Sequence, residues 1–214
     1  MGCKHKKSYI SSMKALIIVD VQNDFLPGGN LAVSQGDTII PVINTLQSKF
    51  DLVVATQDWH PKHHRSFASS HSNKAAFEVI QLHGKEQTLW PDHCVQESPG
   101  ASFSSALSQA RIEAIFRKGT DPEIDSYSGF FDNDKQKATG MHAYLQSKSV
   151  NHLYIVGLAA DFCVYYTACD GISLGYQVTL IENASKAIDN TSLQSKLNRF
   201  KTIGGHTSTS NAYI

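Results

Sequence analysis

The chain has 214 residues, of which 41% are hydrophobic and 18% charged, and its 19 basic side chains balance 19 acidic ones. This length fits one domain with a sizeable core. The balanced charge excludes the electrostatic attraction that drives binding to nucleic acid or to an anionic membrane surface. We therefore expect neither a nucleic-acid partner nor a membrane partner.

The cysteines indicate a reducing compartment. They form no C-x-x-C pair and are too few for a disulfide framework: Cys3, Cys94, Cys163 and Cys169. No apolar stretch of the sequence is long enough to span a membrane, and the basic N-terminus lacks the apolar run of a signal peptide. We expect free thiols and a cytoplasmic protein.

The polar, basic residues 1–12 predict a disordered N-terminal extension, followed by a single domain over residues 13–214. The first strand is predicted over 15–19, where a continuous apolar run is typical of a strand buried on both faces of a parallel sheet. Comparable runs predict strands at 52–56, 114–117, 152–156 and 177–181, and a weaker one at 200–203. Helical patterns fall between them, at 38–49, 139–148, 161–174 and 192–200. This alternation predicts an α/β fold with a parallel sheet and helices on both faces.

Four chemically active side chains follow predicted strands directly. Asp20, Asp58 and Lys118 come at or just after the ends of three strands, and Cys163 follows a fourth. In open parallel sheets, ligands bind at the carboxyl ends of the strands, so these side chains are expected to converge. An acid, a lysine and a cysteine supply a base, an electrostatic partner and a nucleophile, which favours covalent catalysis at a carbonyl.

The turn over residues 155–163 joins an apolar strand to a helix that carries Cys163 in its first turn. A helix N-terminus has unpaired N–H groups and about half a positive charge, which lowers a thiol pKa from about 8.5 toward neutrality. Alternatively, Cys163 is an ordinary buried thiol, because cysteine is among the most buried residue types. The turn alone leaves both interpretations open.

The segment over residues 60–105 is long, polar and rich in histidine. Long connections in compact domains are usually functional or disordered. The spacing of Asp58 and His60 places both side chains on one side of an extended stretch, and His93 follows a Trp-Pro pair. One carboxylate with two or three imidazoles suits Zn²⁺, Fe²⁺ or Mn²⁺ better than Ca²⁺ or Mg²⁺. These side chains form a candidate transition-metal site.

Five separated motifs resemble those of one enzyme family and occur in the family's order. They are IVDVQNDFLPGG at 18–29, TQDWHP at 56–61, WPDHCV at 90–95, DSYS at 125–128 and VGLAADFCV at 156–164. Over residues 14–190 the chain is similar to the nicotinamidase/pyrazinamidase branch of the isochorismatase-like cysteine hydrolases. The resemblance implies a three-layer fold with a six-stranded parallel sheet and helices on both faces.

The resemblance implies a role for each member of the strand-end group. Cys163 would be the nucleophile, Asp20 the base that takes its proton, and Lys118 the cation that holds the thiolate and orients the base. Backbone N–H groups of Ala159 and Cys163 would meet the oxyanion. The family pattern also implies a cis peptide bond between Leu158 and Ala159.

The resemblance further implies the ligands of a metal ion and of a flat substrate ring. One divalent transition metal, with Zn²⁺ favoured over Fe²⁺ or Mn²⁺, would be held by Asp58, His60, His93 and a residue of the 63–64 pair, of which His64 matches better than His63. The pocket residues would be Phe25, Trp90, Tyr127 and Ala159. The family commonly has threonine where this chain has Ala160, so we expect catalysis to be kept and the fine geometry of the turn to differ.

Three functions are compatible with these residues. Hydrolysis of nicotinamide to nicotinate and ammonia, in NAD salvage and with pyrazinamide as a further substrate, uses every feature and is favoured. Another hydrolase of the same fold, acting on isochorismate or on a carbamoyl or ureido compound, would not need the metal ligands. A non-enzymatic thiol-sensing module would need only Cys163 and would leave Asp20 and Lys118 without a role. Nothing in the sequence indicates the oligomeric state.

Overall fold

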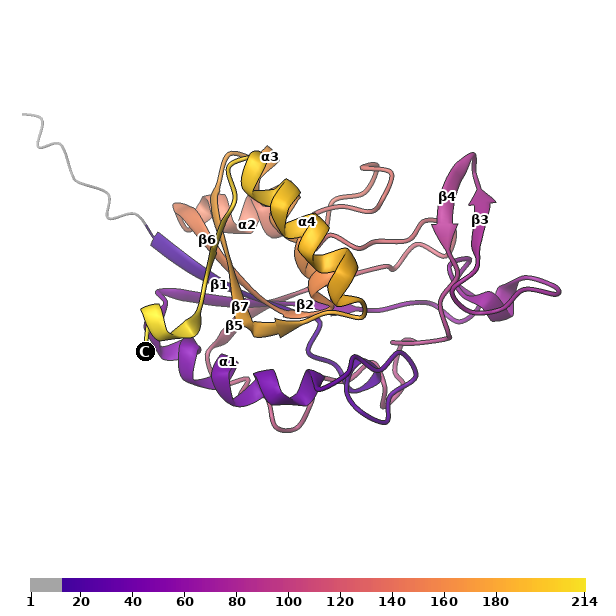
Figure 1. The fold of residues 1–214 in the computed structure, drawn as a ribbon, viewed down its shortest axis with the longest axis horizontal. Coiled ribbons are helices and arrows are strands. Elements are labelled where there is room, and N and C mark those ends of the chain that lie inside the picture. Colours follow the sequence, from indigo (N-terminus) through magenta and orange to yellow (C-terminus); the bar gives the residue numbers. More distant parts are fainter. Residues whose placement is uncertain (1–12) are drawn as a thin grey trace, which may run out of the picture.

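The computed structural model describes residues 13–214, so the extension predicted over residues 1–12 lies outside the described residues. The main feature is a sheet of six parallel strands in the order β5-β2-β1-β6-β7-β8 (Figure 1). The strands are β1 (Met13–Val19), β2 (Leu52–Asp58), β5 (Ile112–Lys118), β6 (Val150–Leu158), β7 (Gln177–Lys186) and β8 (His206–Ser208). The predicted six-stranded parallel sheet is confirmed.

Within the described residues, four α-helices cover the two faces of this sheet. One face carries α1 (Ile40–Leu46), and the other carries α2 (Met141–Ser147), α3 (Tyr165–Ser173) and α4 (Asn190–Thr202) (Figure 1). Short helical turns lie at Asn23–Phe25, Gly36–Ile39, Gln47–Lys49, Ala68–Ser70, Ala160–Val164 and Ser210–Ala212. The predicted three-layer α/β arrangement is therefore confirmed. No helix over residues 13–214 combines the length and apolar character needed to cross a membrane.

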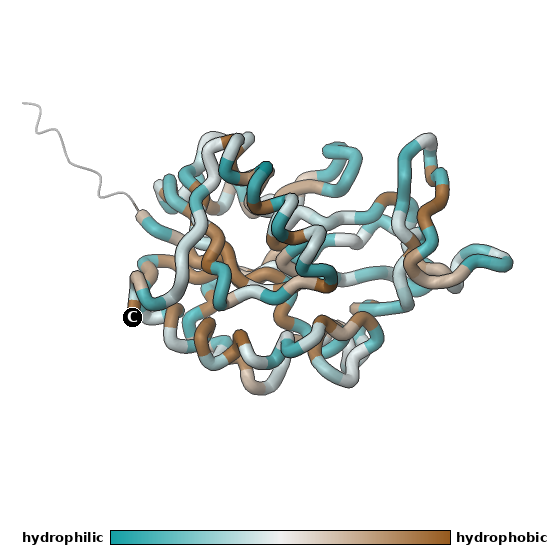
Figure 2. The backbone as a smooth tube through the Cα atoms, in the orientation of Figure 1, coloured by the Kyte–Doolittle hydropathy of each residue, from teal (hydrophilic) through white to brown (hydrophobic). Residues whose placement is uncertain are grey.

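The first strand, β1, shows why the sheet is buried on both faces. Successive side chains of a strand point to opposite faces. Leu16 and Ile18 belong to the hydrophobic cluster that contains α1, whereas Ala15, Ile17 and Val19 belong to the cluster that contains α2, α3 and α4. All five side chains are fully buried. Figure 2 shows hydrophobic residues along the strands between the two helical layers.

The weak sixth strand predicted over residues 200–203 is wrong. These residues fall at the C-terminal end of α4, and the sixth strand is β8, which lies beyond that helix. Leu197 and Phe200 stand at positions i and i+3, so they share one face of the helix, and both are buried. The helical period, rather than the alternation of a strand, places Phe200 in the core.

A short hairpin lies in the histidine-rich segment, where the sequence predicted only a long polar connection. Its antiparallel strands are β3 (Val79–Leu82) and β4 (Lys85–Thr88), and Figure 1 shows them set apart from the main sheet. His83 and Gly84 join the strands with positive φ angles of 52° and 78°, as a two-residue type I′ turn requires. The strands are short and mostly polar, so periodicity did not indicate them.

Candidate active site

The four strand-end side chains converge as the sequence predicted. Lys118 Nζ lies 2.9 Å from Asp20 Oδ2 and 2.9 Å from Asp58 Oδ1, and it donates to Cys163 Sγ at 3.4 Å. These residues lie at the carboxyl ends of β1, β2 and β5 and in the turn after β6, which are neighbours in the sheet. One ammonium group therefore contacts two carboxylates and a thiol.

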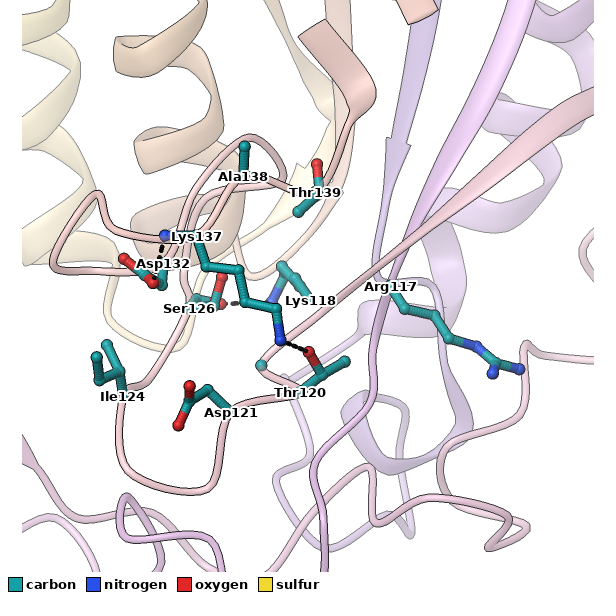
Figure 3. Close-up of a pocket in the computed structure, with 11 residues that line it drawn as sticks. Arg117, Lys118, Thr120, Asp121, Ile124, Ser126, Asp132, Lys137, Ala138 and Thr139 are labelled. Atoms are coloured by element: carbon teal, nitrogen blue, oxygen red, sulfur yellow. Dashed lines mark hydrogen bonds between the residues drawn. The ribbon is translucent and has the colours of Figure 1, made fainter. Parts of the chain in front are cut away.

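Lys118 is a fully buried cation with four polar contacts. Besides the three side chains, its Nζ donates to the carbonyl oxygen of Ser126 at 2.9 Å (Figure 3). Burial alone would lower the pKa of Lys118, but the charges of Asp20 and Asp58 raise this pKa well above its ordinary value. The ammonium group stays charged at neutral pH and can stabilise negative charge on sulfur.

Asp20 has the environment of a general base. It is fully buried, and its Oδ1 accepts a hydrogen bond from Thr56 Oγ1 at 2.6 Å. Burial raises the pKa of Asp20, and the charge of Lys118 opposes that rise only in part. A carboxylate with a raised pKa accepts a proton more readily than an ordinary aspartate, because its charged form is less well solvated.

Asp58 stands between Lys118 and the other candidate metal ligands. Gln22 fixes its backbone, because the Gln22 side chain accepts from Asp58 N–H and donates to Asp58 C=O, each at 2.8 Å. Burial would raise the pKa of Asp58, but His60 and Lys118 beside the carboxylate hold that pKa well below its ordinary value. Asp58 is therefore an anion that can pair with Lys118 and also bind a metal ion beside His60.

The turn that carries Cys163 has the geometry implied by the resemblance. The peptide bond between Leu158 and Ala159 is cis, and the π-helical turn Ala160–Val164 leads into α3. Burial raises the pKa of Cys163, the opposite direction to the fall that a helix N-terminus favours, and the charge of Lys118 opposes this rise. A base beside the thiol would therefore assist the loss of its proton.

All predicted ring-binding residues line one cavity together with Cys163. Phe25, Trp90, Tyr127 and Ala159 surround it together with Cys163. A hydrogen bond joins two of these aromatic side chains, because Trp90 Nε1 donates to the hydroxyl of Tyr127 at 3.3 Å. The cavity has a free volume of ≈ 20 Å³, so its side chains lie close together.

Four further residues of this cavity were not assigned from the sequence: Leu31, Asp125, Phe162 and Ile188. Asp125 opens the DSYS motif and Phe162 precedes the nucleophile, so both had a signal in the sequence. Phe162 packs edge-on against Trp90, with ring centroids 4.9 Å apart. Ile188 lies two residues after the end of β7 and has no sequence signal, because only the fold brings this segment to the pocket.

A second cavity of ≈ 150 Å³ lies beside the end of β5, on loops over residues 119–139 (Figure 3). Its loops are tied together by Asp132, which accepts from the backbone N–H of Lys137 at 2.8 Å, and by Lys137 Nζ, which donates to Thr120 Oγ1 at 3.0 Å. Cys163 and the aromatic pocket residues are absent from its lining. The aromatic cavity, which contains Cys163, is therefore the candidate substrate site.

The candidate metal ligands gather beside the pocket. Asp58, His60 and His93 each offer a ligand atom within 4.8 Å of the others, and His60, His64 and Asp125 form a second, overlapping group. His60 Nε2 lies 3.1 Å from Asp58 Oδ2, and His93 Nε2 lies 3.5 Å from the same atom. The structure places His64 in this cluster, whereas His63 is exposed.

The orientation of two imidazoles fits metal binding. His60 Nδ1 contacts the carbonyl oxygen of Gly119 at 2.9 Å, and His93 Nδ1 contacts that of Pro91 at 2.8 Å. An Nδ1–H held by a carbonyl leaves the Nε2 lone pair free, which is the arrangement that protein metal sites use. Gly119 is required for this approach, because a Cβ there would lie 2.4 Å from the ring of His60.

His64 fits less directly. Its buried Nε2 has no hydrogen-bond partner among the described residues, as an inward-facing ligand atom would have. Its Nδ1 lies 3.1 Å from Ser66 N and 2.8 Å from Ser66 Oγ. Binding a metal through Nε2 requires Nδ1 to carry the proton and donate it to Ser66 Oγ. Burial lowers the pKa of His64 to about 4, which keeps the ring in the neutral form that metals bind.

One hydrogen bond aligns the loop that carries His93 with the loop after β1. Asp24 Oδ2 accepts from the backbone N–H of Cys94 at 2.7 Å. This contact places His93 against Phe25, with ring centroids 5.5 Å apart. The candidate metal site and the ring pocket therefore share a wall.

Comparisons with known proteins agree on one family. The isochorismatase domain model matches residues 14–212. A nicotinamidase of Acinetobacter baylyi is 51% identical over 181 residues, which cover 84% of this chain and 85% of the relative. A solved nicotinamidase and pyrazinamidase of Acinetobacter baumannii superposes with a TM-score of 0.92 at 44% identity, over 95% of this chain and 99% of that one.

A pyrazinamidase of Pyrococcus horikoshii, solved in complex with zinc, is also similar. It superposes with a TM-score of 0.76 at 35% identity and covers 92% of this chain and 99% of its own. The sequence motifs, the strand order of the sheet and the geometry of the site indicate the same family as these relatives. The chain belongs to the isochorismatase-like hydrolase family, in its nicotinamidase/pyrazinamidase branch.

Proposed function

We propose that this chain hydrolyses nicotinamide to nicotinate and ammonia through a thioester on Cys163. The observation that carries the proposal is the position of Lys118 Nζ between Asp20, Asp58 and Cys163 Sγ, with the same cysteine lining an aromatic cavity. The high identity to curated nicotinamidases supports the choice of substrate.

The first half of the reaction forms the thioester. Asp20 takes the thiol proton, and Cys163 Sγ attacks the carboxamide carbon while Lys118 stabilises the negative charge. The carbonyl oxygen becomes an oxyanion, which backbone N–H groups of Ala159 and Cys163 receive, each worth about 3 kcal/mol by analogy with known oxyanion holes. Asp20 then returns the proton to the amide nitrogen, the C–N bond breaks, and ammonia leaves.

The second half of the reaction hydrolyses the thioester. Asp20, again a carboxylate, takes a proton from water, and the hydroxide attacks the thioester carbon. The C–S bond breaks, the proton on Asp20 returns to Cys163 Sγ, and the released nicotinic acid loses its proton to water as nicotinate. The raised thiol pKa fits this cycle, because a basic sulfur regains its proton once the acyl group has left.

Asp58, His60, His93 and His64 would hold one divalent transition metal ion, and the zinc complex of the Pyrococcus horikoshii pyrazinamidase supports Zn²⁺ as the first choice over Fe²⁺ or Mn²⁺. The ion would supply a Lewis-acid site that a pyridine nitrogen can coordinate. This chain's own contribution is to keep the imidazoles oriented and Asp58 ionised.

We place the reaction in NAD salvage, in the cytoplasm, with pyrazinamide as a further substrate. The names of the relatives support pyrazinamide, since one curated relative is a nicotinamidase/pyrazinamidase. The cysteines of the described residues, Cys94, Cys163 and Cys169, are free thiols, which agrees with a reducing compartment.

The alternatives lack a supporting observation. A thiol sensor needs an accessible cysteine with a low pKa, whereas Cys163 is 6% exposed and burial raises its pKa. A hydrolase of the same fold with a carbamoyl or isochorismate substrate would have no use for the imidazoles that face Asp58. The aromatic cavity and these imidazoles together favour a flat nitrogen heterocycle.

Ammonia release from nicotinamide tests the proposed function. We expect the purified protein to release one ammonia and one nicotinate for each nicotinamide consumed. Isochorismate and carbamoylated amines serve as comparison substrates in the same assay. Turnover of one of these with none of nicotinamide would contradict the proposal.

The pH dependence of the reaction should report the pKa of Asp20. The base must be ionised in the free enzyme, so kcat/KM is lost as the pH falls through this raised pKa. Thr56→Val removes the hydrogen bond that favours the carboxylate and raises the pKa further, so we expect the acid limb to move upward by about one pH unit. Thr179→Val, at a buried threonine of β7 bonded to His152, is the matched control. An unmoved acid limb in Thr56→Val would remove Asp20 as the base.

A further inference from the structure

One side of the ring pocket comes from the segment over residues 187–189, which joins β7 to α4. Ile188 lines the cavity with Cys163, and it is also 37% exposed. The side chain therefore stands at the mouth of the pocket, with one side toward the ring site and one toward solvent. Phe25 and Trp90 line the same cavity but are 3% and 4% exposed, so they belong to the core.

This segment is held by a residue of the nucleophile turn. Asp161 is fully buried, and its Oδ1 accepts from the backbone N–H of Ile188 at 2.9 Å while its Oδ2 accepts from that of Asp189 at 3.0 Å. Lys196 of α4 donates to the backbone carbonyl of Asp161 at 2.5 Å. The position of Ile188 relative to Cys163 is thus set by a single carboxylate, two positions before the nucleophile.

Ile188 is the exposed member of the pocket lining, since the other lining residues are buried or partly buried. The ring pocket has a free volume of ≈ 20 Å³, so its walls are close together. A substituent on a bound ring would therefore meet the side chain at the mouth of the pocket. A separate cavity of ≈ 190 Å³ is lined by Ala187 of the same segment, with Ala160 and Leu193 among others.

We propose that Ile188 is a specificity-determining residue, which limits the ring substituents that an aromatic carboxamide can carry, and that Asp161 is the positioning residue that sets its distance from Cys163. The proposal rests on the proposed amidase function. A branched side chain at the pocket mouth excludes bulk by direct contact, and shortening it enlarges the pocket without removing a catalytic group.

Ile188→Ala, assayed with nicotinamide and with its 2-, 4-, 5- and 6-methyl derivatives, tests the specificity role. The readout is the kcat/KM of each derivative divided by that of nicotinamide. We expect this ratio to rise about 10-fold for at least one ring position. A single methylene group in an apolar pocket changes the discrimination in kcat/KM between two substrates by at least about this factor. Ile203→Ala, at an isoleucine that is 43% exposed and outside the ring pocket, is the matched control.

No change in any of the four ratios beyond that of Ile203→Ala would overturn the role of Ile188. A wild-type protein without nicotinamide turnover would instead contradict the proposed function, so the two failures are distinguishable. Rates are expressed per titrated Cys163 thiol, which corrects each variant for its folded fraction.

Asp161→Asn tests the positioning role. An amide keeps one acceptor but turns an N–H group toward one of the two backbone N–H groups, which loosens the segment. We expect the methyl-derivative ratios to rise as in Ile188→Ala, and the double variant to show no further rise, because both changes act on one contact. If Asp161 only supported the fold, Asp161→Asn would lower kcat/KM equally for all substrates and leave the ratios unchanged. That result would overturn the positioning role of Asp161.

Discussion

Replacing Cys163 with alanine is expected to lower kcat for nicotinamide by on the order of 10⁶-fold, the scale seen when a catalytic nucleophile is removed. The change deletes the sulfur that Lys118 contacts at 3.4 Å and leaves the aromatic lining in place. Binding of nicotinamide should therefore persist. Single-turnover ammonia release and a calorimetric titration with nicotinamide measure the two effects separately.

Cys169→Ala is the control for this experiment. Cys169 is a free, partly exposed cysteine of α3 outside the ring pocket, so its replacement should leave kcat and KM near the wild-type values. Wild-type protein incubated with nicotinamide and quenched in acid should carry a nicotinoyl group on Cys163. Substantial turnover by Cys163→Ala would exclude covalent catalysis at this residue.

Removing the metal ion is expected to raise KM for nicotinamide, with a smaller effect on the reactivity of the Cys163 thiol. The reason is that different side chains would bind the metal and activate the thiol, since the imidazoles contact Asp58 while the thiol contacts Lys118. Elemental analysis of protein purified without a histidine tag should find about one transition-metal ion per chain. Chelation followed by kinetics measures the loss, and re-addition of Zn²⁺, Fe²⁺ or Mn²⁺ identifies the ion that restores KM.

Single histidine variants test which residues hold the ion. His60→Ala should abolish metal binding, and His64→Ala should weaken it, whereas His63→Ala is the matched control because this neighbour is exposed. Equal metal content in His63→Ala and His64→Ala would remove His64 from the ligand set. A metal-free protein with full turnover, or an unchanged metal content and KM in His60→Ala, would contradict the metal assignment.

The convergence of the strand-end residues was predictable because parallel topology imposes it. A continuous apolar run such as 15–19 is stable as a strand only with both faces covered, and parallel strands share one edge for their carboxyl ends. Asp20 and Lys118 are far apart in the sequence, yet their side chains meet at 2.9 Å. Local sequence therefore identified the residue types of the site and the edge at which they meet.

Other properties depend on segments that are close only in space. The direction of the Cys163 pKa shift is a balance between desolvation and the charges of Lys118 and Asp20, and the helix position known from the sequence did not include that burial. His63 and His64 are neighbours of the same type, yet the folded loop leaves His63 exposed with a positive φ of 67° and buries His64. The strand predicted at 200–203 is helical because its phenylalanine completes the buried face of α4.

By itself, the sequence determined the fold class, the family and the residues at the strand ends, because these follow from apolar periodicity and from motifs of adjacent residues. Only the tertiary structure shows that burial raises the pKa of Cys163, that His64 is buried beside His60, and that Ile188 lines the pocket with its backbone N–H on the carboxylate of Asp161. Those outcomes depend on desolvation and on distances between distant segments. Neither quantity exists until the sheet and its two helical layers have assembled.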